Sequence, residues 1–82
     1  MNELEIKVLG KNSSNRMKLL KNIEKGTSNE KGNIEVTLLE DEKYLSKYGI
    51  SNTPALVIND KVISQGKILT EKEIKHYLKI LS

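Results

Sequence analysis

The fold is decided by one stretch in the second half of the chain, Lys47-Tyr48-Gly49-Ile50-Ser51-Asn52-Thr53-Pro54-Ala55-Leu56-Val57-Ile58-Asn59-Asp60-Lys61-Val62. Its four apolar residues from Ala55 to Ile58 are typical of a strand that is buried on both faces. Asn59-Asp60 predicts a tight two-residue turn, since Asn tolerates positive φ there. Residues 62–64 then return as a second strand, so the pair forms an antiparallel hairpin. Pro54, the only proline, stands directly before the first strand of this hairpin.

Upstream, polar and apolar residues alternate twice, which predicts one strand around Leu4 to Val8 and another around Ile34 to Leu38. Between them, an apolar stripe predicts a helix from Arg16 to about Glu24, and the segment from Gly26 to Asn33 is rich in turn-forming residues. A strand–helix–strand unit of this length has parallel strands and a right-handed crossover.

Two more helices complete the pattern. The acidic run Glu40-Asp41-Glu42 favours the start of a short helix, and Gly49 suits the position just after the end of that helix. Thr70 and Glu73 have the spacing of a capping box, followed by apolar residues at helical spacing. The order β-α-β-α-β-β-α predicts an α/β fold with a four-stranded mixed sheet, helices on both faces, and a single domain over residues 1–82.

Composition excludes several classes of function. The chain has 82 residues and no cysteine, so it forms no disulfide and performs no thiol catalysis. Three Tyr without Trp or Phe disfavour base stacking, and the net charge of +3 comes from interleaved Lys, Arg, Asp and Glu. We therefore expect no nucleic-acid partner. The longest apolar run has four residues, against about 20 for a membrane span. With no signal-peptide pattern at the N-terminus, the predicted location is the cytoplasm.

No metal or cofactor is predicted. Consecutive acids at a helix start, as at residues 40–42, rarely converge on one ion, so we interpret them as a solvated helix start. His76 is the only histidine and lies off the apolar stripe of the last helix, which makes it a surface residue.

With a polar loop after its first strand and Thr-Pro before its third, the chain resembles the thioredoxin pattern. It is similar to the minimal thioredoxin-like proteins of prokaryotes, often labelled small redox-active disulfide proteins. The stretch quoted above carries most of this resemblance, and residues 6–10, 18–19 and 66–67 also match. The resemblance implies a thioredoxin-like fold and a cis Thr53–Pro54 bond beside the redox site.

The sequence departs from the family at that site. The resemblance places the family's Cys-x-x-Cys at Ser13 and Arg16, where this chain reads Ser13-Ser14-Asn15-Arg16. Thiol–disulfide exchange needs a thiolate that attacks a sulfur and a second thiol that resolves the mixed disulfide. We therefore expect no enzyme activity of the family's kind and assign no catalytic residue.

The tetrad Ser13, Ser14, Asn15 and Arg16 remains a candidate binding site. It lies at a predicted helix N-terminus, where free N–H groups favour anions, and an exposed Arg16 would add positive charge. The alternative is plain helix capping by residue 12, 13 or 14 beside an exposed arginine. Met17 is expected either exposed beside this loop or in the core.

Thr53 and Pro54 are the second candidate. The resemblance implies that the residue before this proline offers backbone groups to an extended peptide or to glutathione, so binding would be strand addition. The alternative is that Pro54 only shapes the turn into the third strand.

The preferred hypothesis is a non-catalytic thioredoxin-fold module that binds a protein or an acidic or extended peptide through Ser13 to Arg16 and the Thr53–Pro54 edge. One alternative is a glutathione-handling enzyme or binder in which Ser13 donates a hydrogen bond to the ligand's thiolate. Another is a dimerising scaffold, and the expected state is a monomer or a weak homodimer.

Overall fold

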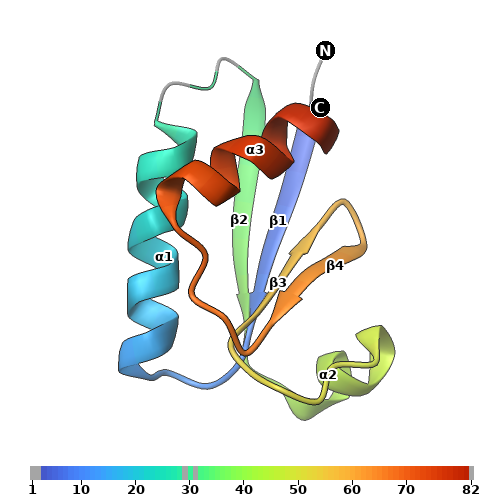
Figure 1. Ribbon diagram of the computed structural model, residues 1–82. Helices are drawn as coiled ribbons and strands as arrows, with labels where there is room; N and C mark the ends of the chain where they lie inside the picture. Colours follow the sequence, from blue (N-terminus) through green and yellow to red (C-terminus); the bar gives the residue numbers. More distant parts are fainter. Residues whose placement is uncertain (1–2, 29, 31, 82) are drawn as a thin grey trace.

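The computed structural model describes residues 3–28, 30 and 32–81. Seven elements follow one another in the predicted order (Figure 1). They are β1 (Glu3–Leu9), α1 (Ser14–Thr27), β2 (Asn33–Leu39), α2 (Glu42–Tyr48), β3 (Ala55–Ile58), β4 (Lys61–Gln65) and α3 (Glu71–Leu81).

The four strands form one mixed sheet in the order β2-β1-β3-β4. β1 and β2 are parallel, as the crossover predicts, whereas β1–β3 and β3–β4 are antiparallel. The turn between β3 and β4 has Asn59 at φ 49° and Asp60 at φ 65°, which confirms the predicted two-residue turn. The fold is therefore an α/β fold with a mixed sheet and three helices.

The helices lie on both faces of the sheet. α1 and α3 pack on one face over the larger core, whose fully buried members include Ile6, Leu19, Leu56 and Ile74. α2 packs on the other face over a smaller core of Leu9, Ile50, Ala55 and Val57. None of the helices in the described part of the chain has the length and apolar character that crossing a membrane requires.

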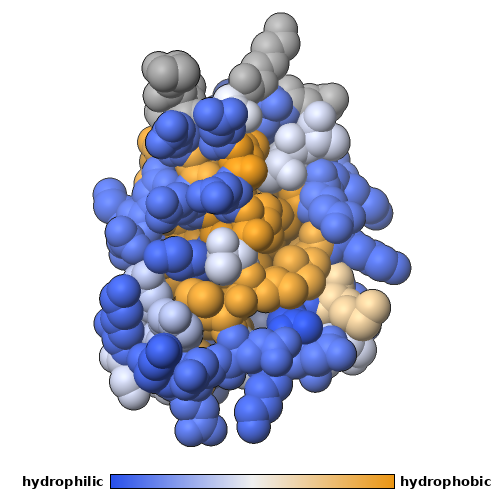
Figure 2. All heavy atoms as spheres, turned by 180° about the vertical axis from the view of Figure 1, so that it is seen from behind, coloured by the Kyte–Doolittle hydropathy of each residue, from blue (hydrophilic) through white to orange (hydrophobic). Residues whose placement is uncertain are grey.

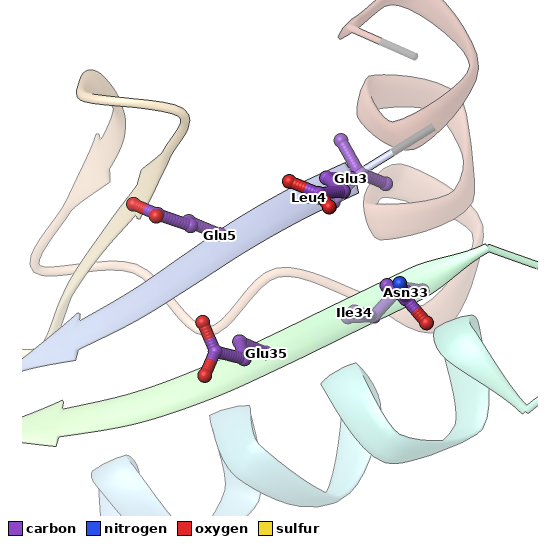
Figure 3. Close-up of a pocket in the computed structure, with 6 residues that line it drawn as sticks. All are labelled: Glu3, Leu4, Glu5, Asn33, Ile34 and Glu35. Atoms are coloured by element: carbon purple, nitrogen blue, oxygen red, sulfur yellow. The ribbon is translucent and has the colours of Figure 1, made fainter. Parts of the chain in front are cut away.

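α2 leaves part of its face of the sheet uncovered, and polar side chains stand there. Glu3 and Glu5 on β1 and Glu35 on β2 line an open cavity of about 360 Å³ (Figure 3). Seen from the side opposite to Figure 1, the molecule also has apolar surface in its centre, bordered by polar side chains (Figure 2).

The first helix is longer than predicted at both ends, and Gly26 lies inside it rather than in a turn. A Cβ at Gly26 would lie 2.8 Å from Ile74 Cγ2, which is closer than side chains approach one another. The prediction of a turn there was wrong, because this glycine allows α1 to pack closely against α3.

A polar network joins β1, α2 and the β3–β4 turn on the α2 side. Lys7 Nζ donates to the Tyr48 hydroxyl at 2.9 Å, and that hydroxyl donates to Asp60 Oδ1 at 3.0 Å. Lys7 Nζ also donates to Asp60 Oδ1 at 3.4 Å. The hydrogen bond from Tyr48 and, after it, the one from Lys7 lower the pKa of Asp60.

This network predicts a pH dependence of stability. Because folding lowers the pKa of Asp60, its contribution is present above the unfolded value and is lost as pH falls through the folded value. We expect the difference in free energy of unfolding between wild type and Asp60→Asn to shrink as pH falls from about 6 to about 2. Urea unfolding at several pH values measures this difference in free energy. Tyr48→Phe is the control that removes the hydrogen bond from Tyr48 to Asp60. A difference that stays constant with pH would contradict it.

Candidate binding site

Ser13 begins the candidate site as the N-cap of α1. Its backbone is extended, with φ −157° and ψ 164°, and its Oγ accepts the Arg16 N–H at 3.1 Å. Of the three residues that could cap this helix, Ser13 is therefore the one that does. Ser14 and Asn15 follow it in the first turn of α1 and are exposed to solvent.

Arg16 is buried, which corrects the expectation of an exposed cation. Its side chain is only 8% exposed, and its Nη1 donates to the Gly10 carbonyl at 3.1 Å and to Glu40 Oε1 at 2.6 Å. Its Nε is buried without a hydrogen-bond partner among the described residues. The guanidinium thus ties the first turn of α1 to the ends of β1 and β2, and it is not free to attract a ligand.

The parallel pairing of β1 and β2 explains how Arg16 reaches a residue 24 positions away. Parallel strands end at the same edge of the sheet, and Gly10 N–H donates to the Leu39 carbonyl at 3.0 Å. The residues that follow the two strands, Gly10 and Glu40, therefore lie near each other beside the start of α1. Sequence reasoning missed this ion pair, because it treated Glu40 only as part of a helix start.

Thr53 lies against the end of β1. A Cβ at Gly10 would be 2.9 Å from Thr53 Cβ, and Gly10 has φ +133°, a conformation that L side chains rarely adopt. The Thr53–Pro54 peptide bond is cis. Pro54 is buried, and its carbonyl accepts the Gly66 N–H at 2.9 Å.

Thr53 itself is exposed and offers its backbone. Among the residues that the structure describes, neither its N–H nor its carbonyl has a hydrogen-bond partner. A residue whose N–H and carbonyl both lack a partner can pair with an added strand.

One cavity of about 300 Å³ brings the two candidate segments together. Ser13 and Thr53 both line it, whereas Ser14, Asn15, Arg16 and Pro54 do not. The complete lining is Gly10, Lys11, Asn12, Ser13, Glu40, Glu42, Leu45 and Thr53. We call this cavity the Thr53 pocket. Glu42 and Leu45 come from α2 and were not predicted as site residues.

The charges around the Thr53 pocket are balanced. Glu40 is paired with Arg16, and the remaining charged residues of the lining are Lys11 and Glu42. The pocket therefore gives no reason to expect an acidic ligand, because the positive charge of Arg16 is already neutralised by Glu40.

Met17 and His76 lie outside the Thr53 pocket. Met17 is 53% exposed, so it is not a core residue. His76 is exposed on α3 and packs edge-on against Tyr77, with ring centroids 5.7 Å apart. Within residues 3–28, 30 and 32–81, no group of three or more His, Cys, Asp or Glu side chains is arranged to hold a metal ion.

Comparisons with known proteins agree with this fold. A solved structure of a malarial protein is similar over 98% of both chains, with a TM-score of 0.75 and 10% sequence identity, which shows the fold alone. A search of curated proteins found no match. A family model described as a thioredoxin domain matches residues 4–79. Since this match spans nearly the whole chain, the protein belongs to the thioredoxin-domain family.

Proposed function

We propose that this chain is a redox-inactive thioredoxin-fold protein that binds an extended segment of a protein partner at the Thr53 pocket. The observation that carries the proposal is that Thr53 is exposed and that its backbone N–H and carbonyl both lack a hydrogen-bond partner among the described residues. The chain has no cysteine, so its own side chains supply no thiol for disulfide exchange.

The binding mode follows from the geometry around Thr53. A peptide in extended conformation would pair with this residue through its main chain and place one side chain in the cavity between Ser13 and Leu45. Because main-chain hydrogen bonds carry the affinity and the charges are balanced, we expect little dependence on salt. The small contact area predicts a dissociation constant on the order of micromolar or weaker.

An amide NMR titration tests the proposal. A capped, uncharged tetrapeptide in extended form is expected to shift the signals of residues 10–13 and 52–55. The same peptide with its central amides N-methylated should shift them far less, because it cannot complete the pairing. The dissociation constant should change less than about twofold between roughly 0.05 and 0.5 M salt.

Glutathione belongs in the same titration as a second ligand. Shifts of the same signals at lower concentrations of glutathione than of the peptide would favour the glutathione-binding alternative. Shifts confined to Glu71–Leu81 of α3 with every ligand would reject the Thr53 pocket as the site.

A further inference from the structure

β2 forms an open edge of the sheet. Of the described strands it pairs with β1 alone, in uninterrupted register from Asn33 to Leu39, and each of its residues is exposed or half-buried. The opposite edge, β4, begins at Lys61 and has an irregular register with β3, two features that discourage strand pairing. β2 contains no Lys, no Pro and no bulge, and within the described sheet its outer edge is paired with no strand.

The two sides of this edge differ in chemistry. Val36 and Leu38 are 45% and 44% exposed. Their partners on β1 face the core under α1 and α3, so Val36 and Leu38 point to that side. Glu35 points to the other side of the sheet, where Glu3 and Glu5 of β1 also stand (Figure 3). An added strand would therefore lie beside the apolar side chains of Val36 and Leu38 on one side of the sheet and beside the Glu35 carboxylate on the other.

The position of α1 restricts which partners can pair with the outer edge of β2. Figures 1 and 3 both show α1 running alongside β2, on the side away from β1. The Arg16–Glu40 pair holds the start of α1 at the end of β2, next to the 53% exposed Met17. A second copy of this chain would bring its own α1 to the same side and its own Glu35 near the first. The edge suits a segment without a helix of its own.

We propose that the outer edge of β2 binds an extended segment of a partner protein in which apolar residues alternate with Lys or Arg. The apolar residues would cover Val36 and Leu38, and the basic residues would lie beside Glu35. Main-chain bonds to β2 would give affinity, and the alternation would give specificity. This surface shares no residue with the Thr53 pocket, so the two binding proposals can be tested independently.

The test uses a capped seven-residue peptide of alternating valine and lysine, titrated into the isotope-labelled protein. We expect amide shifts over residues 34–38 and none over residues 52–55. The same peptide N-methylated at every amide should not bind, because neither of its edges can donate main-chain hydrogen bonds. Equal shifts with the methylated peptide, or shifts confined to other elements, would overturn the proposal.

A charge swap tests the polar side of the edge. Glu35→Lys should weaken binding of the valine–lysine peptide about two- to fivefold and strengthen binding of a valine–glutamate peptide by a similar factor. Glu71→Lys on α3 is the matched control and should change neither. An unchanged preference in Glu35→Lys would contradict the stated chemistry of the partner.

A second pair of variants tests the apolar side. Val36→Lys should reduce binding of the valine–lysine peptide at least several-fold, since it removes an apolar contact and adds a like charge. Ile80→Lys, at a residue that is 61% exposed on α3, should leave binding unchanged. Equal effects of the two variants would show that β2 is not the docking surface.

Discussion

Replacement of both Ser13 and Arg16 by cysteine is expected to give this chain a reversible disulfide and measurable disulfide reductase activity. The two positions lie one helical turn apart, and Ser13 Oγ already contacts the Arg16 N–H at 3.1 Å. Residues three apart at a helix start face the same side, and a disulfide can join two residues whose Cα atoms lie within about 7 Å. The helix N-terminus also lowers the pKa of a thiol at position 13 and so favours the reactive thiolate.

Two measurements check this expectation. After mild oxidation, thiol titration should find no free thiols in the Ser13→Cys/Arg16→Cys variant. In an insulin reduction assay the variant should exceed the wild-type chain, which should equal the buffer blank because it contains no cysteine. Ser14→Cys/Arg16→Cys is the matched control, since residues two apart on a helix point in different directions. Two thiols that stay free in the first variant would show that the former redox positions are wrongly placed.

The β3–β4 turn, the start of α3 and the end of α2 were predictable because their signals are local. The capping box is formed as predicted, with Glu73 N–H donating to Thr70 Oγ1 at 3.2 Å and Thr70 N–H donating to Glu73 Oε1 at 3.1 Å. Gly49 ends α2 with φ 66°, the left-handed conformation that made glycine the expected residue there. Each of these features depends on residues a few positions apart, so the sequence contains its cause.

Features that depend on distant residues were not predictable in the same way. Gly26 looked like a turn residue, and only its distance to Ile74, 48 positions later, shows why a helix contains it. Val36 and Leu38 alternate like the residues of β1, yet they are nearly half exposed because β2 is an edge strand. Alternation predicts a strand but not whether a helix covers it.

The candidate site was predictable only in part. The topology and the resemblance pointed to Ser13 and Thr53, and both line the Thr53 pocket. Arg16 was misread because charged side chains are usually exposed, and its partner Glu40 is remote in sequence. A signal was nonetheless present: the predicted parallel pairing puts the residues after β1 and β2 at one edge, which places Gly10 beside Glu40.

The Arg16–Glu40 pair predicts an asymmetric response to mutation. Removing the carboxylate in Glu40→Ala leaves a buried guanidinium whose one remaining partner among the described residues is the Gly10 carbonyl. We expect a loss of about 2 kcal/mol in free energy of unfolding, below the roughly 3 to 5 kcal/mol for a fully buried pair because the Glu40 side chain is 56% exposed. Arg16→Met should cost less, since it removes the buried charge and its unpartnered Nε, fills much of the same space and leaves Glu40 free to be hydrated.

The double variant separates this explanation from a simple loss of contacts. If Glu40→Ala lowers stability because it leaves the buried Arg16 charge without its carboxylate partner, then Arg16→Met/Glu40→Ala should be about as stable as Arg16→Met alone. Urea unfolding of the wild type, the two single variants and the double variant closes the cycle. Glu42→Ala, a neighbouring acid of the pocket with no ion pair among the described residues, is the control and should cost less than about 1 kcal/mol, since it loses only the interaction with the dipole of α2. Additive losses in the double variant would mean that Arg16 and Glu40 stabilise the chain separately, and that the pair does not hold α1 against the ends of β1 and β2.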